Sequence, residues 1–230
     1  MCSSDPFSSA CQSHNVPLLL DAVQAVGKVP VSFRRLGVAA LAFGAHKFHG
    51  PRGVGGLLLR RGLRLTPLLH GGHQEGGRRP GTEPVPLIVG MARALQLWQT
   101  HHEETTRHIS TLRDQLEDLL RQNCAPVRIH GSGTVRLPNT VSIAFPGVSG
   151  EALLVNLHMA GVACSLGSTC ASGSAEAAPA LLAMGIPNDV CRSTIRLSLS
   201  RMTTPDEVHR AASIIATTVQ RLRSTSGSSP

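Results

Sequence analysis

Apolar residues in the first part of the chain gather into three short runs, each bounded by glycine, proline or charged residues. The runs cover residues 18–20, 38–43 and 54–59. Runs of this length between turn-forming residues are typical of buried strands, and the first two are typical of a parallel sheet. Ahead of them, residues 1–17 begin serine-rich, and we expect no more than a helix there.

A longer pattern follows from residue 84 to about residue 122, where apolar residues recur at steps of three and four. This spacing predicts a helix with one buried stripe. The polar residues 101–104 divide the stripe, and we expect a hinge between two domains there, with a solvated face rather than a metal site. The stripe comprises Ile88, Met91, Leu95, Trp98, Ile109, Leu112, Leu116 and Leu119.

The rest of the sequence alternates between strand and helix patterns. Strands are predicted at residues 127–129, 140–145, 162–164 and 193–201, and helices at residues 151–159 and from residue 203 onward. The last helix starts with a proline and two acidic residues, as helix N-termini often do. We expect its buried stripe to comprise Val208, Ala211, Ile215, Val219 and Leu222.

Together these patterns predict an α/β fold in two parts. Residues 1–102 would form part of a large domain with a sheet, residues 103–224 a smaller α/β domain, and residues 225–230 a disordered tail. A chain of 230 residues with 41% hydrophobic content can bury such cores. No run of 18 apolar residues occurs, so we expect no membrane span.

Composition limits the cellular compartment and the classes of binding partner that we expect. The first fifteen residues lack the apolar stretch of a secretory signal, and the six cysteines include no CxxC pair. We therefore expect a reducing compartment, the cytoplasm, or mitochondria in a eukaryote. The net charge of +8 raises the question of nucleic acid, but the arginines are scattered along the sequence and aromatic residues are only 3%. We expect a solvated basic surface and no nucleic-acid partner.

Two reactive residues follow the predicted parallel strands. Asp21 ends the first run, and Lys47 comes shortly after the second. The carboxyl ends of parallel strands share one edge, where α/β proteins bind ligands. A lysine buried at such an edge loses its proton readily, and the neutral amine is a nucleophile towards carbonyls. The alternative is that Lys47 caps a helix or pairs with a surface carboxylate.

The strings DAVQAVGK (residues 21–28) and GAHKFHGPRGVGGLLLRRG (residues 44–62) resemble, in order and spacing, the cofactor core of the cysteine desulfurases. These are pyridoxal-phosphate (PLP) enzymes of the class-V aminotransferase type. The resemblance implies the C-terminal part of a fold-type-I PLP-dependent transferase. It implies that Lys47 binds PLP covalently, that Asp21 pairs with the pyridinium nitrogen, that Gln24 bonds the ring hydroxyl, and that His46 contacts the cofactor and moves protons with Lys47. Gly44 stands where the family usually has a serine that contacts the phosphate.

The segment GGHQEGGRRPGTEPVP, residues 71–86, also resembles this family, although a bland surface loop is an alternative for so polar a stretch. By resemblance, Thr82 reaches the PLP phosphate of the other subunit, which implies a homodimer. Arg79 would line the opening of the same PLP site and contact the substrate. Arg196, in a predicted strand, matches the arginine that binds the substrate carboxylate, a bidentate task.

A second chemical site is predicted at SLGSTCASGS, residues 165–174, a loop of small residues that carries Cys170. A thiol on such a loop can travel to a bound substrate, whereas a buried structural cysteine is the alternative. Together with EAAPALLAMGI, residues 176–186, the loop resembles the catalytic loop of desulfurases that supply iron–sulfur assembly. Cys164 is the better structural cysteine, and no zinc site is expected.

The activity implied by the resemblance converts L-cysteine to L-alanine and leaves its sulfur on Cys170 as a persulfide for an acceptor or scaffold protein. Family members carry an N-terminal portion with a phosphate loop and a ring-stacking histidine that have no counterpart here. We therefore expect weaker cofactor binding. Alternatives are a selenocysteine lyase, or a non-catalytic truncated remnant that acts as an interaction or dimerisation module. An aminotransferase would give Cys170 no task.

Overall fold

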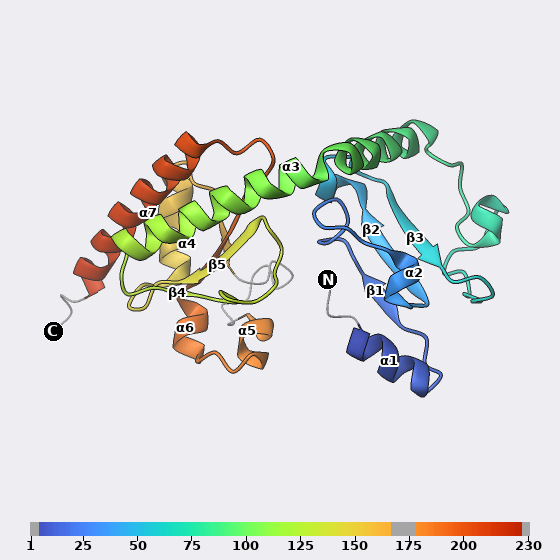
Figure 1. Ribbon diagram of the computed structural model, residues 1–230, viewed down its shortest axis with the longest axis horizontal. Coiled ribbons are helices and arrows are strands. Elements are labelled where there is room, and N and C mark those ends of the chain that lie inside the picture. Colours follow the sequence, from blue (N-terminus) through green and yellow to red (C-terminus); the bar gives the residue numbers. More distant parts are fainter. Residues whose placement is uncertain (1–4, 167–177, 227–230) are drawn as a thin grey trace. The chain divides into compact units, whose positions relative to one another are not determined.

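The structure is a computed structural model that describes residues 5–166 and 178–226. It divides into two compact units, Met1–Glu103 and Glu104–Pro230 (Figure 1). Each unit combines a small sheet with helices, so the expected α/β class is confirmed. The unit boundary falls inside a helix rather than in a loop.

Unit 1 is built on a three-stranded sheet with the order β1-β2-β3. β1 and β2 are parallel, as predicted, and β3 is antiparallel to β2 (Figure 1). Asp21, the last residue of β1, lies beside Ala42 of β2. The elements of this unit are α1 (Asp5–Ser13), β1 (Leu19–Asp21), α2 (Phe33–Leu36), β2 (Ala40–Gly44), the 3-10 helix η1 (Ala45–Phe48), β3 (Gly55–Leu59) and η2 (Gln74–Gly77).

The crossover between β1 and β2 covers one face of the sheet. Leu41 is almost wholly buried there, together with Val38 and Ala22. The crossover ends in α2, whose N-cap Ser32 accepts a hydrogen bond from the backbone N–H of Arg35. The short helix stops at Gly37, which adopts a left-handed conformation that glycine reaches without steric cost.

A close contact joins the crossover to the segment after β2. Gly27 has φ +76°, and a Cβ atom built on it would lie only 2.1 Å from Cβ of Phe48. Phe48 is buried, and its ring also contacts the ring of Phe43. Only a glycine lets these two backbones approach so closely. The two motif strings of the sequence are therefore packed against each other at this point.

The long helix α3 (Val85–Asn123) contains 39 residues and runs without interruption through residues 101–104. The division between the two units falls within this polar patch, after Glu103, although the helix is not interrupted there. Helical hydrogen bonding there is reinforced by local contacts, such as the packing of the Trp98 ring on the His102 ring. In the first part of α3, Gly90 lies against Pro51, where a Cβ would clash at 2.7 Å.

Unit 2 is built on a four-stranded antiparallel sheet with the order β4-β5-β7-β6. Its core includes Phe145, Ile143, Leu153, Ile195 and Ile215, all essentially inaccessible to solvent. Besides the second part of α3, its elements are β4 (Arg128–Ile129), β5 (Thr140–Ala144), α4 (Gly150–Met159), β6 (Ser165–Leu166), α5 (Pro179–Ala183), α6 (Asn188–Arg192), β7 (Thr194–Ser198) and α7 (Pro205–Ser226).

Two predicted boundaries in this unit are wrong. Residues 162–164 are not a strand. β6 begins directly after them, at Ser165, which pairs with Arg196. α7 continues to Ser226, into the segment 225–230 in which we expected disorder. The hydroxyl of Thr225 donates to the backbone oxygens of Arg221 and Leu222 in the preceding turn. Residues 227–230 lie outside the described range.

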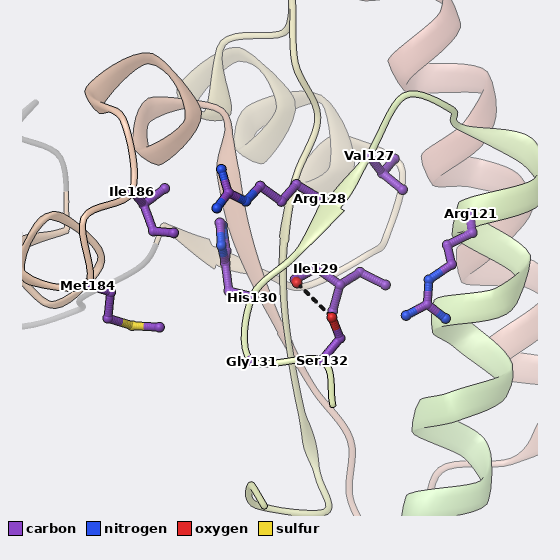
Figure 2. Close-up of a pocket in the computed structure, with 9 residues that line it drawn as sticks. All are labelled: Arg121, Val127, Arg128, Ile129, His130, Gly131, Ser132, Met184 and Ile186. Carbon is purple, nitrogen blue, oxygen red and sulfur yellow. Dashed lines mark hydrogen bonds between the residues drawn. The ribbon is translucent and has the colours of Figure 1, made fainter. Parts of the chain in front are cut away.

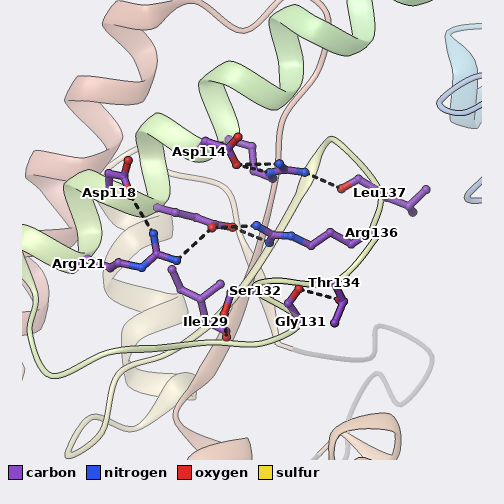
Figure 3. Close-up of polar contacts among 11 residues, drawn as sticks. Asp114, Asp118, Arg121, Ile129, Gly131, Ser132, Thr134, Arg136 and Leu137 are labelled. Atoms are coloured by element: carbon purple, nitrogen blue, oxygen red, sulfur yellow. Dashed lines mark hydrogen bonds and ion pairs between the residues drawn. The ribbon is translucent and has the colours of Figure 1, made fainter.

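A charged residue lies on the buried stripe of α3. Glu117 has a side chain only 3% exposed and accepts two hydrogen bonds from Arg136, at 2.6 and 2.9 Å (Figure 3). Arg121 lies further away, at 3.6 Å, and is bonded mainly to Asp118. The hydrogen bonds that Arg136 donates to Glu117 raise the pKa of Arg136 further above its usual range. Such a buried carboxylate is stable only while it stays paired.

We predict that Gly27→Ala destabilises unit 1 more than Gly62→Ala does. Both glycines have positive φ, so an alanine costs about 1–2 kcal/mol at either position. Gly62 faces open space, whereas Gly27 meets Phe48, and the overlap should add about 1–3 kcal/mol. Urea unfolding followed by circular dichroism measures both variants, and equal losses would contradict the contact.

We also predict that Arg136→Met destabilises unit 2 by about 3–5 kcal/mol, because it leaves Glu117 buried without its bidentate partner. The matched control is Arg121→Met, which removes a largely exposed ion pair and should cost about 1 kcal/mol or less. Adding Glu117→Met to Arg136→Met should recover most of the loss in the same unfolding measurement. A double variant that is less stable than Arg136→Met alone would show that the buried pair is not the cause.

Candidate functional site

Lys47 lies in η1, directly after the carboxyl end of β2. The 3-10 turn is anchored by backbone bonds from Ala45 to Val54 and from Gly50 back to Ala45. Ala45 and Phe48, three residues apart, face the core and are buried. Because side chains three apart share a side of a 3-10 turn, the two residues between them, His46 and Lys47, project outward and are exposed.

Lys47 is therefore exposed, and the expectation that it is buried at the sheet edge is wrong for this chain. Its amine has no hydrogen-bond or ion-pair partner among the described residues, so it is neither a helix cap nor part of a surface pair. The sequence contains only one other lysine, Lys28. Lys28 donates a 2.6 Å hydrogen bond to Oε1 of Gln24. Lys47 is thus the lysine whose amine is accessible for covalent chemistry.

Asp21 and Gln24 occupy the turn that follows β1. Oδ1 of Asp21 accepts a 2.9 Å hydrogen bond from the backbone N–H of Val23, which fixes the carboxylate and leaves its second oxygen available. The bond from Lys28 engages the carbonyl oxygen of Gln24 and leaves its amide N–H groups available as donors. Both side chains are exposed. Because β1 and β2 are parallel, Asp21 and Lys47 lie at the same edge of the sheet, as predicted.

His46 lies against Gly44. A Cβ atom built on Gly44 would be 3.4 Å from Cε1 and 3.5 Å from Nδ1 of the His46 ring. A side chain as small as serine would therefore fit at position 44 with only a slight adjustment of the imidazole. The glycine is thus not required by packing there.

Arg79 and Thr82 lie in the loop that surrounds η2, and both are exposed. The Arg79 guanidinium donates to the backbone oxygen of Pro80. The loop is held by Oε1 of Gln74, which accepts a hydrogen bond from the backbone N–H of Gly81. No described residue bonds the hydroxyl of Thr82, which leaves it available as a donor.

Arg196 lies in the interior of the unit 2 sheet, in β7, with Ser142 of β5 on one side and Ser165 of β6 on the other. Its Nε atom is buried and has no hydrogen-bond partner among the described residues. A buried N–H without an acceptor costs about 1–3 kcal/mol. An anionic group placed at this guanidinium would remove that cost, which suits the predicted binding of a carboxylate. Cys170 lies outside the described residues.

Two cysteines of unit 2, Cys124 and Cys164, are poor nucleophiles because of their surroundings. Burial raises the pKa of the Cys124 thiol to about 11, although Arg223 opposes the shift. Burial also raises the pKa of Cys164, which packs partly buried against the unit 2 core just before β6. A raised pKa keeps the thiol protonated at neutral pH.

The structure also contains a pocket of about 460 Å³ that sequence reasoning did not anticipate. Met184 and Ile186 lie on one side of β4 and Arg121 of α3 on the other (Figure 2). His130, which also lines it, is buried, and burial, with a smaller effect from Arg128, lowers its pKa. Among the predicted site residues that the structure describes, none lines this pocket. It is therefore separate from the lysine edge, which is a better candidate for chemistry because reactive groups converge there.

Sequence reasoning also did not single out Glu117, although its position beside Leu116, on the apolar stripe of the long helix, could have indicated a buried charge.

Within residues 5–166 and 178–226, no three His, Cys, Asp or Glu side chains lie close enough together to hold a metal ion. In the same ranges, no helix combines the length and hydrophobicity that a membrane span requires.

The side chains at the lysine edge fit PLP chemically. An accessible amine can bond an aldehyde carbon, and a fixed carboxylate can pair with a ring nitrogen. The free amide N–H groups of Gln24 can donate to a ring oxygen. Gly44 offers no side-chain hydroxyl at this edge.

Residues 4–211 match the aminotransferase class-V family. A cysteine desulfurase of Klebsiella pneumoniae is 47% identical over 206 residues, which are 90% of this chain and 52% of that protein. A cysteine desulfurase of Trichormus azollae is 44% identical over 207 residues, again 90% of this chain and 52% of the relative. The chain thus spans about half the length of the curated relatives it matches.

Solved structures give the same picture. A NifS-like protein matches with a TM-score of 0.85 at 34% identity, over 95% of this chain and 57% of that one. DndA from Streptomyces lividans matches with a TM-score of 0.68 at 28% identity, over 86% of this chain and 56% of that one. The predicted fold, a part of a PLP-dependent transferase, is confirmed.

Proposed function

The chain belongs to the aminotransferase class-V family, and we propose that it carries the lysine and thiol half of a PLP-dependent cysteine desulfurase. The observation that carries the proposal is that Asp21 and Lys47 lie at the same edge of the sheet. Of the two lysines in the sequence, Lys47 is the one whose amine is accessible. The reaction would convert L-cysteine to L-alanine.

PLP would be held by Lys47 through its amine, by the carboxylate of Asp21 and by the amide of Gln24. Thr82 would contact the phosphate of PLP in a second copy, which makes a homodimer part of the proposal. When bound, PLP would supply an electron sink for the negative charge that develops at the substrate α-carbon. A carboxylate at the ring nitrogen favours its protonated form, which strengthens this sink.

Arg196 would hold the substrate carboxylate. Its Nε donor is buried and has no acceptor among the described residues, so a carboxylate would give it the partner it lacks. Arg79 would contribute a second guanidinium at the mouth of the site. Two fixed cations would orient the substrate so that its α-carbon and sulfur occupy defined positions.

Protons would be moved by Lys47 and His46, which are neighbours on the exposed side of η1. The thiol of Cys170 would then accept the substrate sulfur. One S–S bond forms at Cys170 while the carbon–sulfur bond of the substrate breaks, and the carbon receives a proton to give alanine. The products are a Cys170 persulfide and alanine, so the atoms balance. An acceptor or scaffold protein would take up the sulfur.

We predict that PLP attaches to Lys47. After incubation with PLP and borohydride reduction, peptide mass spectrometry should find the cofactor on Lys47 of the wild-type chain. Lys47→Ala should abolish the label, because the only other lysine is engaged by Gln24. The matched control, Lys28→Ala, should keep the label on Lys47. A label on Lys28 in the wild type would contradict the assignment.

We further predict that Cys170→Ser abolishes persulfide formation and sulfide release without altering PLP attachment, because the thiol acts after the cofactor is bound. Cys164→Ser is the control and should retain activity, since burial raises the pKa of that thiol. Persulfide is measured by mass spectrometry after addition of L-cysteine. Selenium release from L-selenocysteine by the Cys170→Ser variant would instead favour a selenocysteine lyase.

A further inference from the structure

The pocket beside β4 lies within unit 2, apart from the proposed enzymatic site. Its volume of about 460 Å³ is in the range of small-molecule sites. Its lining residues fall on two sides of β4, with Arg128, His130, Met184 and Ile186 on one side and Arg121 on the other (Figure 2). The first side combines a cation, an imidazole and apolar surface. We call these first four residues the β4 pocket.

The tautomer of His130 is set by the neighbouring hydroxyl of Thr194. Nε2 of His130 lies 3.0 Å from the Thr194 hydroxyl oxygen, and this oxygen lies 2.8 Å from the backbone oxygen of Val190. Because a carbonyl carries no proton, the hydroxyl donates to Val190 and can only accept from His130. The hydrogen of the neutral ring is therefore on Nε2, which leaves Nδ1 as an acceptor.

Nδ1 of His130 is a buried acceptor without a donor. His130 is only 8% exposed, and its Nδ1 atom has no hydrogen-bond partner among the described residues. Burial, with a smaller effect from Arg128, lowers the pKa of His130, so the ring stays neutral at pH 7. A buried polar atom without a partner is costly, and a ligand group that donates a hydrogen bond to Nδ1 would remove this cost.

Arg128 supplies the available positive charge of the β4 pocket. Its guanidinium forms no hydrogen bond or ion pair with the described residues, whereas Arg121 is bonded to Asp118. The described residues that line the pocket include no acidic side chain. Arg128 lies close enough to His130 to influence its pKa, so one small ligand can reach both groups. A guanidinium binds a carboxylate through charge-assisted hydrogen bonds.

Met184 and Ile186 give the β4 pocket an apolar side. Both follow α5, and Ile186 packs against a small buried cluster that includes Leu181 and Cys191, which holds it in place. Met184 is 60% exposed and unbranched, so it can change rotamer to admit a ligand. A short aliphatic chain suits these two side chains.

We propose that the β4 pocket binds a 2-hydroxy carboxylate with a short aliphatic side chain. The carboxylate would pair with Arg128, the hydroxyl would donate to Nδ1 of His130, and the chain would lie against Met184 and Ile186. An amino acid fits less well, because its ammonium group would lie beside the cation of Arg128. No described residue of the proposed enzymatic site lines the pocket, so the proposal is independent of that activity.

The test uses the full chain and 2-hydroxy-4-methylpentanoate, with binding measured by isothermal titration calorimetry. Arg128→Gln should weaken binding by about tenfold or more, because it removes a charge-assisted pair. Arg128 is exposed, so this variant should fold. The matched control is Arg210→Gln, which removes the same charge from an exposed side chain of α7. It should change binding by less than about threefold, because distant exposed charges are screened.

The hydroxyl contact is tested with 4-methylpentanoate, which lacks the donor. It should bind about three- to tenfold more weakly than the hydroxy acid, because Nδ1 of His130 then stays unpaired. In a chain labelled with ¹⁵N at its histidine rings, the Nδ1 signal of His130 should shift with the hydroxy acid and not with 4-methylpentanoate. Thr194→Val frees the ring to place its hydrogen on either nitrogen, so the preference for the hydroxy acid should fall.

Equal losses in Arg128→Gln and Arg210→Gln, equal binding of the two acids, or no binding of the hydroxy acid would overturn the proposal. Tighter binding of L-leucine would assign the pocket to an amino acid instead. Binding that is lost in Arg196→Gln and kept in Arg128→Gln would place the ligand at β7. Both of these results contradict the proposal as well.

Discussion

The parallel pairing of β1 with β2 is the constraint on which the arrangement of unit 1 depends. It sends the carboxyl ends of both strands to one edge, so the residues that follow each strand must lie at the same place. The contact between Gly27 and Phe48 then holds the two following turns together. Asp21 and Lys47 share an edge because of this backbone arrangement, since no bond between their side chains joins them.

The same pairing gives the sheet of unit 1 two edges with different chemistry. One carries an amine, a carboxylate and an imidazole, which suit covalent catalysis. The other carries guanidinium groups that have no partner among the described residues, together with exposed leucines. The separation follows from β3, which runs back along β2 and delivers Arg60 and Arg61 to the edge opposite Lys47.

Unit 2 contains one buried charged side chain that is fully paired and another charged side chain with an unpaired buried donor atom in the described structure. Glu117 is fully paired, and its two hydrogen bonds from Arg136 offset the cost of removing the carboxylate from water. Arg196 is only partly buried, yet its Nε has no acceptor in the described structure. The paired carboxylate contributes to stability, whereas the unsatisfied donor is a feature that stability alone does not explain. An anionic group placed at this guanidinium would give the donor its partner.

The sequence by itself determined most of the strands, the long helices and the family motifs. Apolar periodicity depends on neighbours along the chain. Asp21 and Lys47 could be placed because each lies at or just after the end of a predicted strand. Only the tertiary structure decided what depends on distant contacts. Lys47 is exposed because Ala45 and Phe48 occupy the buried side of the same 3-10 turn. The continuity of α3 through residues 101–104 was likewise visible only in the structure. The pairing of Glu117 with Arg136 and the gathering of arginines at one edge required the fold, since burial and charge proximity are set by residues far apart in sequence.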